Sequence, residues 1–457
     1  MSSTASEHMP SAERRAVASL ASLYAMRMLG LFMVLPVMMV EGQQLAGASP
    51  ALLGLAMGVY GLTQALLQIP AGTLSDRIGR KPVIIGGLVL FSAGSVIAAG
   101  AESVYGIIVG RALQGAGAIA SAIMALVTDL THEQHRMKAM ASIGASIGLS
   151  FSVALVAGPW LASIGGLQAI FALTAALAVT GIVITAWLVP SPPRLQHRDA
   201  SAAWPEVKRQ LANTSLWPLN LGIFLLHALM VAIFVAIPLQ LVEAGIGSHH
   251  HAWLYLPVLL AAFVLMVPFI IIAEKRRQMK SVVIIGAIVI ALSLLMMALA
   301  NQVWHWAALM LMYFWGFNLM EASLPSWLSK IAPAGAKGSA MGIYSSMQFL
   351  GAFLGGSLGG LVLASYGSST LFVTLALLVL AWSSIIACTQ APRHLTSMRL
   401  SCHQSLTPQQ LVALQQLAGV ADVTWLADEQ AVYLKISADE FDASTAHTII
   451  NPAQAVA

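Results

Sequence analysis

Long apolar stretches, separated by short polar segments, make up most of this chain. A helix that crosses the hydrocarbon core of a bilayer needs about 20 predominantly apolar residues. The stretches found here are too long and too uniformly apolar for the strands of a membrane barrel, which alternate over about ten residues. The sequence therefore predicts an all-α membrane protein with twelve transmembrane helices, over 17–40, 50–72, 82–101, 105–128, 137–161, 168–189, 217–241, 252–273, 281–300, 304–328, 338–364 and 369–390.

Composition supports the same assignment. Of the 457 residues, 58% are hydrophobic and only 9% are charged, whereas soluble domains carry about 25% charged residues. Most of the chain must therefore meet lipid. The first apolar stretch is about 24 residues long, which suits a spanning helix better than the core of a cleaved signal peptide. The two cysteines, Cys388 and Cys402, do not indicate a disulfide framework.

The 22 Lys and Arg residues are spread unevenly along the chain. Two of them, Arg27 and Arg111, lie inside predicted helices, and the others fall in the N-terminal segment, in every second loop or in the C-terminal tail. Cytoplasmic loops carry the excess of Lys and Arg, so both termini are expected in the cytoplasm. We expect a monomeric multi-pass protein of the cell inner (plasma) membrane, with the lipid bilayer as its surroundings and no nucleic acid as a partner.

An internal repeat divides the chain into two halves. FMVLP at 32–36 matches FVAIP at 234–238, and VIIG at 83–86 recurs at 283–286, so weak matches agree on one offset of about 200 residues. Chance similarity among apolar segments is the alternative. Repeated halves of this kind pack about a pseudo-twofold axis and bind small molecules between them near the bilayer midplane. The expected units are an N-terminal segment 1–16, two pseudo-symmetric six-helix bundles at 17–189 and 217–390, a linker 190–216 and a small domain 395–457.

The sharpest motif, GTLSDRIGRK at 72–81, follows the second predicted helix. It resembles the G-x-L-x-D-R-x-G-R-[RK] signature of the major facilitator superfamily, which implies a transporter that works by alternating access. A small residue such as Gly72 lets two membrane helices approach closely, and Asp129, at the end of the fourth helix, is a natural partner for either arginine. The resemblance thus implies a conformational latch made by Gly72, Asp76, Arg77, Gly79, Arg80 and Asp129. A basic loop that only sets topology is the alternative.

Two further motifs resemble elements of the same superfamily. RALQGAG at 111–117 is similar to its R-x-x-Q-G-x-G element, which implies that Arg111 tunes proton coupling; the alternative is a structural anchor that hydrogen-bonds neighbouring helices. Gly158-Pro159 in the fifth helix resembles the centre of the antiporter signature, and Gly148 extends a small-residue face for helix packing. The glycines that often follow Gly-Pro are absent, so this signature is partial.

Few ionisable groups lie deep in the predicted helices, and such groups mark functional sites. Arg27, His227 and Glu321 lie at similar depths on helices 1, 7 and 10, which line the central cavity in the superfamily, and all three are expected to meet there. Glu321 is the leading candidate for the proton carrier, with Arg27 as a nearby cation. A static Arg27–Glu321 pair, and a histidine at 227 that only packs in the core, are the alternatives.

Polar and aromatic side chains on these helices are candidates for substrate contact. They are Gln64, Gln68, Phe224, Asn318 and Gln348. The triplet 249–251 of histidines is read as a polar loop, and no metal site is predicted. No nucleotide-binding loop and no catalytic constellation is visible, so we expect no enzyme activity and no cofactor, with the proton as coupling ion and a small molecule as substrate.

The tail after about residue 393 has the composition of a soluble domain. Its pattern predicts a strand at 395–401, a helix from Thr407 to about Leu417, strands at 420–426 and 431–436, and a second helix from about Ser437. This β-α-β-β-α order reads as a small α/β ferredoxin-like domain; a disordered tail is the alternative. The tail, together with the segments 318–326 and 337–346, resembles the YajR-type branch of the superfamily, whose members carry a cytoplasmic YAM domain.

That resemblance implies proton-driven export of small molecules or drugs, and it leaves the substrate open. A small regulatory ligand on the tail domain is a further expectation. The alternatives are a proton-coupled importer or facilitator of a sugar or metabolite, and a membrane sensor that uses the tail domain as its output.

Overall fold

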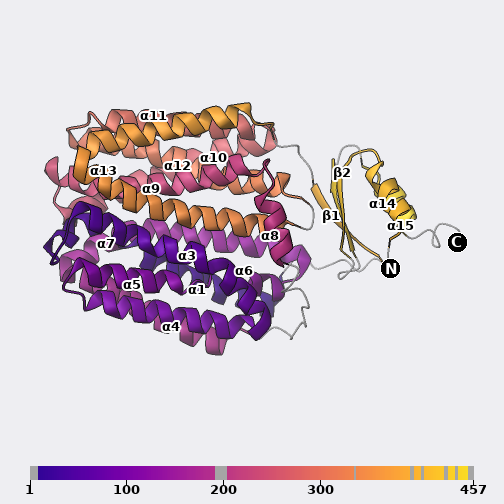
Figure 1. Cartoon of the computed structure of the whole chain (residues 1–457), viewed down its shortest axis with the longest axis horizontal. Coiled ribbons are helices and arrows are strands. Elements are labelled where there is room, and N and C mark those ends of the chain that lie inside the picture. The colour runs from indigo at the N-terminus through magenta and orange to yellow at the C-terminus, as the bar shows by residue number, and fades with distance from the viewer. Residues whose placement is uncertain are drawn as a thin grey trace.

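The computed structural model describes residues 9–190, 203–333, 336–391, 396–402, 406–426, 431–437 and 441–450. A large bundle of long helices carries a small α/β domain at one end (Figure 1). We call the end of the bundle next to this domain the domain end, and the opposite end the far end. The predicted fold class is confirmed, because two six-helix halves lie side by side in the bundle and the small domain follows them.

The first half is built from long helices joined by short turns. Two of them begin at serine caps: the Ser49 side chain accepts a hydrogen bond from the Leu52 amide before α3, and Ser103 does the same before α5, which is a common way to satisfy the first free amides of a helix. The elements are α1 (Ser11–Phe32), α2 (Met38–Glu41), η1 (Gly42–Gln44), α3 (Pro50–Ile78), α4 (Arg80–Ala99), α5 (Val104–Ala116), α6 (Ala120–Asp129), α7 (Glu133–Val183) and the π-helical turn η2 (Ile184–Leu188).

The second half repeats this plan after the linker helix α8 (Ala203–Leu211), which lies near the domain end (Figure 1). Its elements are α9 (Trp217–Glu243), η4 (Ser248–His250), α10 (His251–Lys275), α11 (Met279–Met297), α12 (Val303–Ile331) and α13 (Lys337–Cys388). Both α7 and α13 contain two spans. The chain reverses inside α7 at Gly166, with φ of 59°, and inside α13 at Gly367, with φ of 81°; glycine tolerates such left-handed backbone without strain.

Within the described residues, eight helices are long and apolar enough to cross a membrane by length and composition, and α7 and α13 count once each among them. Each of α7 and α13 contains a second span, and α1 and α12 also match predicted spans. Together with the eight helices, these make up the twelve predicted spans. Two details of the prediction are wrong. The fourth span is broken between Ala116 and Ala120 into α5 and α6, and the first helix ends at Phe32 rather than at residue 40.

The two halves meet closely at the far end, where α3 crosses the first span of α13. A Cβ atom on Gly54 would lie 2.4 Å from the Gly356 carbonyl oxygen, and one on Gly58 would lie 2.5 Å from that of Phe353. Backbones approach this closely in membranes only where side chains are missing. On the same side, Ser248 donates a weak hydrogen bond of 3.5 Å to Glu41. The far end is therefore the closed end in this conformation.

The small domain has the predicted β-α-β-β-α order. Its elements are β1 (Thr396–Ser401), α14 (Pro408–Gln415), β2 (Val420–Leu426), β3 (Ala431–Ile436) and α15 (Ala443–Ile450). The strands form one antiparallel sheet in the order β1-β3-β2, and Thr407 and Gln410 form a capping box at the start of α14. The last helix begins at Ala443 rather than at the predicted Ser437. Leu400, Leu414 and Leu434 are buried in a core of its own.

Candidate functional site

A charged cluster forms at the domain end of the first half, where α3 turns into α4. Gly79 lies between the two helices with φ of 100° and ψ of 152°, a backbone conformation that favours glycine. The turn brings Arg80 to both acids of the predicted latch: its Nε donates to Asp129 over 3.0 Å, and its Nη1 pairs with Asp76 and donates to Ser75 over 2.7 Å. The Arg80 and Asp129 side chains are only 15% and 20% exposed.

The sequence left open which arginine pairs with Asp129, and the structure selects Arg80. Arg77 is exposed on the last turn of α3 and has no ion pair with either acid. Gly72 lies opposite Ser121 of α6, with a virtual Cβ only 3.2 Å from the serine Oγ, and that oxygen donates to the Gln68 carbonyl over 3.0 Å. The cluster thus joins α3, α4 and α6 within one half of the molecule. Whether it switches the two halves stays a prediction.

Arg111 of α5 is buried, with 1% of its surface exposed, and it hydrogen-bonds the neighbouring helix α3. Its Nε and Nη2 each donate over 3.3 Å, to the carbonyls of Ala56 and Met57, and its Nη1 donates to Gln114 over 3.0 Å. Its guanidinium also lies 5.0 Å from the centre of the Tyr60 ring. This geometry is that of the anchoring alternative. Among the residues that the structure describes, no acid forms an ion pair with Arg111, and its part in proton coupling stays a prediction.

Arg27 does not join Glu321 as the sequence predicted. Its Nη2 donates to the Tyr60 hydroxyl over 2.7 Å and to Gln64 over 2.5 Å, and Gln64 donates in turn to Gln68 over 3.1 Å. All of these side chains are buried inside the first half. The static Arg27–Glu321 pair is therefore absent from this conformation. Of the two glutamines predicted to contact substrate, Gln64 accepts a hydrogen bond from the buried arginine, and Gln68 accepts one from Gln64.

Glu321 of α12 faces His227 of α9, with 3.8 Å between Oε2 and Nδ1. The other ring nitrogen of His227 lies 2.7 Å from Nε2 of Gln348, on the first span of α13. Glu321 Oε2 and His227 Nδ1 are both buried and have no hydrogen-bond partner. The predicted His227, Glu321 and Gln348 are thus brought together from three helices, and no Lys or Arg in the described part of the chain forms an ion pair with the acid.

The remaining substrate candidates lie close to this group along the chain. Asn318 is half-buried, one turn before Glu321 on α12, and the Phe224 backbone packs against Gly351 of α13.

Aromatic rings pack across the boundary between the halves next to this polar group. Phe151 of α7 makes an edge contact with Phe32, with ring centres 5.0 Å apart, and it lies 6.3 Å and 6.5 Å from Phe314 and Phe317 of α12. The Phe317 ring is 6.0 Å from His227. Sequence reasoning missed Phe151 and Phe317, because an aromatic residue in an apolar helix gives no sign of the face on which it lies.

Only one end of the partial antiporter signature packs closely against a neighbouring segment. A Cβ on Gly158 would lie 2.4 Å from the Met33 carbonyl oxygen, so Gly158-Pro159 allows α7 to touch the turn after α1. Gly148 has no neighbouring atom within 4 Å of a virtual Cβ. The predicted packing face is therefore confined to the Gly158 end in this conformation.

The second half contains an ion pair at its domain end with the charges exchanged. Glu274, at the end of α10, accepts from Lys330 of α12 over 2.6 Å and from Ser326 over 2.8 Å. The second half lacks the glycines and the Asp-Arg order of the first-half signature, yet a charged contact forms there as well. It joins the ends of α10 and α12, whereas the pair of the first half joins the start of α4 to the end of α6.

The small domain contacts the bundle beside this second pair. The Lys435 Nζ of β3 donates to the Lys330 carbonyl oxygen, at the end of α12, over 2.5 Å. Burial, and secondarily the charge of Lys337 at the start of α13, lowers the pKa of Lys435 to about 8. A partly desolvated lysine thus joins the small domain to the domain end of the second half.

Two six-helix halves that share an internal repeat, with ionisable side chains buried among their helices, match the architecture of a secondary transporter. The chain belongs to the Major Facilitator Superfamily, whose family model matches residues 17–356. It is a multi-pass membrane transporter and not an enzyme.

The chain is similar to the inner membrane transport protein YajR of Escherichia coli K12, at 46% identity over 429 residues, which cover 93% of this chain and 94% of that protein. It is also 25% identical over 333 residues to the multidrug resistance protein MdtH of Aeromonas salmonicida, covering 72% of this chain and 82% of the relative. A D-xylose-proton symporter structure superposes with a TM-score of 0.65 at 19% identity, over 83% of this chain and 98% of that one; this likeness shows the fold. The predicted resemblance to YajR-type transporters is confirmed.

Proposed function

We propose that this chain is a proton-coupled exporter of small lipophilic molecules and that Glu321 carries the coupling proton. The supporting observation is the group formed by Glu321, His227 and Gln348, in which the acid and the imidazole face each other without a permanent cation. A charge inside a membrane protein is costly, and intramembrane acids that face another titratable group mark proton pathways. Proton uptake and release at Glu321 would therefore depend on which end of the molecule admits water.

The charge pattern supports an orientation in the membrane, which assigns the closed end to one side. Lys and Arg gather in the loops of the domain end, so the positive-inside rule assigns that end to the cytoplasm. The far end, held shut by the α3–α13 glycine contacts, would then face the periplasm. The rings of Phe151, Phe314 and Phe317 beside an acid suit a lipophilic cation, and the similarity to a protein named for multidrug resistance favours export.

Purified protein in proteoliposomes that enclose a pH-sensitive dye tests this proposal, with ethidium as the cargo probe. Addition of ethidium should drive protons across the membrane in the parent protein. The substitution Glu321→Gln should abolish this proton movement and leave the exchange of labelled for unlabelled ethidium intact, because exchange needs no net proton transfer. The matched control is Glu243→Gln, which neutralises an exposed acid at the far end of α9.

Each result distinguishes between the candidate functions. Unchanged proton movement in Glu321→Gln would refute Glu321 as the carrier. Ethidium movement without protons in the parent would indicate a facilitator, and cargo moving in the same direction as the proton would indicate an importer.

A further inference from the structure

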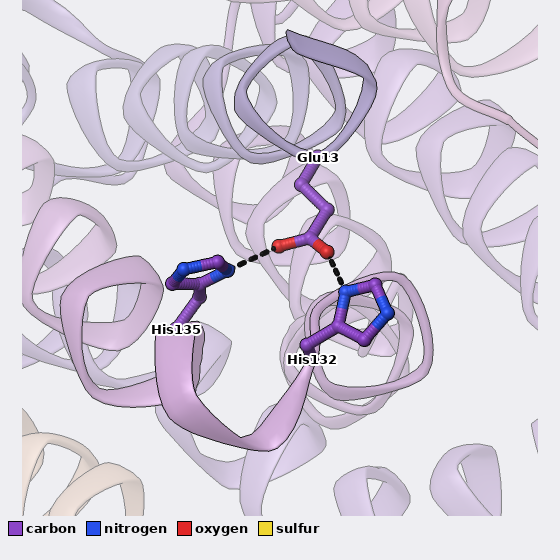
Figure 2. Close-up of side chains that lie close together, drawn as sticks. All are labelled: Glu13, His132 and His135. Atoms are coloured by element: carbon purple, nitrogen blue, oxygen red, sulfur yellow. Dashed lines mark hydrogen bonds and ion pairs between the residues drawn. The ribbon is translucent and has the colours of Figure 1, made fainter. Parts of the chain in front are cut away.

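Three potential metal-binding side chains meet at the domain end, away from the polar group between the halves (Figure 2). Glu13 lies in the first turn of α1, His132 is the N-cap of α7, and His135 lies in the first turn of that helix. The Nδ1 of His135 is 2.9 Å from one Glu13 carboxylate oxygen, and the Nδ1 of His132 contacts the other. These ligand atoms all lie within 4.8 Å of one another.

The local sequence explains why both rings face the same acid. Residues three apart lie on one face at the start of a helix, so His132 and His135 point to the same side of α7. Glu13 approaches from α1, which packs along α7. Figure 2 shows the carboxylate between the two imidazole rings, which belong to one helix start while the acid belongs to another.

The burial of the three side chains differs in a way that suits a bound ion. Glu13 and His135 are buried, with 7% and 5% of their side chains exposed, whereas His132 is 73% exposed. A buried carboxylate needs a positive partner. The two imidazoles supply one only when they are protonated, but a divalent cation supplies one while both rings are neutral. The exposed side at His132 leaves an approach from water and room for a water ligand.

We propose that Glu13, His132 and His135 form a binding site for a first-row divalent transition metal of the Zn²⁺ type. Two imidazole nitrogens and one carboxylate oxygen, with a water in the fourth position, are a common ligand set for Zn²⁺, at about 2.0–2.2 Å from each protein ligand. Mg²⁺ and Ca²⁺ prefer oxygen-only ligands and are excluded by the two imidazoles. A modest rearrangement of the exposed His132 ring would bring all three ligand atoms to one ion.

The position of the site gives it a role in regulation rather than in cargo movement. His132 follows Asp129 by three residues, and Asp129 holds Arg80. A metal ion would tie the start of α1 to the segment between α6 and α7, which directly follows Asp129 at the end of α6. Metal occupancy would thereby stiffen the domain end of the first half. This inference does not depend on which cargo is moved.

Metal binding is tested on the full chain, purified through a tag without histidine and placed in lipid nanodiscs. The background carries His249→Asn, His250→Asn and Cys388→Ser, since these exposed side chains bind metals nonspecifically. Titration calorimetry with Zn²⁺ should give one site per chain, and Co²⁺ should develop the visible absorption of a tetrahedral complex. Mg²⁺ should give neither signal.

The decisive variant is His132→Asn, because an exposed ring can be removed without disturbing the packing of α1 on α7. It should weaken Zn²⁺ binding by at least about tenfold, the low end of the range seen when support of a metal ligand is removed, and Glu13→Gln should do the same. His305→Asn removes another exposed ring, on α12, and should leave affinity unchanged. Absence of Zn²⁺ binding in the background protein, or equal affinity in His132→Asn, would overturn the proposal.

Discussion

From the contact between α3 and α13 we predict that Gly54→Ala, which adds one methyl group, will open the far end. A Cβ at position 54 would lie 2.4 Å from the Gly356 carbonyl oxygen and 2.8 Å from the Gly360 Cα. Both neighbours are backbone atoms, which cannot rotate away as a side chain can. An ordinary van der Waals contact of a Cβ atom begins at 3.4 Å, so Gly54→Ala must push the two helices apart by about 1 Å.

Overpacking of this kind costs about 1–3 kcal/mol, and the cost falls only on the conformation in which α3 touches α13. The ratio of closed to open far ends should therefore fall by about five- to 150-fold. Alanine also raises helix propensity by about 1 kcal/mol over glycine, but this gain applies to both conformations and cancels.

Electron–electron distance measurements between two spin labels would detect the shift. Gln43→Cys places a label on the exposed face of η1 in the first half, and Ser365→Cys places one beside the chain reversal of α13 in the second, in a background without Cys388 and Cys402. Gly54→Ala should move the distance distribution to longer values.

The control is Gly86→Ala on α4, where a virtual Cβ has no atom within 4 Å, and it should leave the distances unchanged. An unaltered distribution in Gly54→Ala, or the same shift in Gly86→Ala, would show that this glycine contact does not hold the far end shut.

Three further predictions concern charged groups. Arg80→Ala should lower the free energy of unfolding by about 1.5–3 kcal/mol, because it removes charge-assisted hydrogen bonds that are mostly buried, whereas the exposed Arg77→Ala should stay within about 0.5 kcal/mol in the same thermal unfolding assay. Arg111→Lys should also destabilise the protein, by about 1–3 kcal/mol, since lysine cannot reach both α3 carbonyls at once; equal melting temperatures would contradict this. Burial holds the pKa of Lys435 at about 8 instead of 10.5. Between pH 8 and pH 10.5, the docked domain therefore binds fewer protons than the free domain. Docking should tighten as the pH rises from about 8 to about 10. Energy transfer between dyes on the domain and the bundle would measure this, and Lys435→Met should abolish the pH dependence.

The sequence was sufficient for the elements but not for the faces on which their side chains lie. The strands of the small domain at 420–426 and 431–436 match β2 and β3, because a period of two residues specifies a strand directly. The depth of Arg27 and Glu321 in the membrane was also readable by counting along a helix. Counting does not give the direction in which each side chain points around the helix axis. Arg27 contacts Tyr60 and Gln64 rather than Glu321.

Contacts between distant segments were missed for a second reason. Glu13 and His132 are 119 residues apart, and no local motif connects an acid in the first turn of α1 with a histidine before α7. Glu274 and Lys330 were missed although the sequence repeat was recognised. The second half lacks the Asp-Arg order of the first-half signature, but an ion pair needs only opposite charges at neighbouring helix ends.

The two halves resemble each other more closely in their internal hydrogen bonds than in their sequences. Lys81, at the start of α4, donates to carbonyls at the end of the sixth span, including Val189 over 2.9 Å, and Lys280, at the start of α11, donates to Ala387 and Thr389 at the end of the twelfth, each over 2.7 Å. With the two domain-end ion pairs, each half is tied to itself by charged contacts. Charged hydrogen bonds inside each half, and mainly backbone and aromatic contacts between the halves, favour motion in which each half rocks as a unit. Opening of the far end must then begin with separation of α3 from α13 at their glycine contacts.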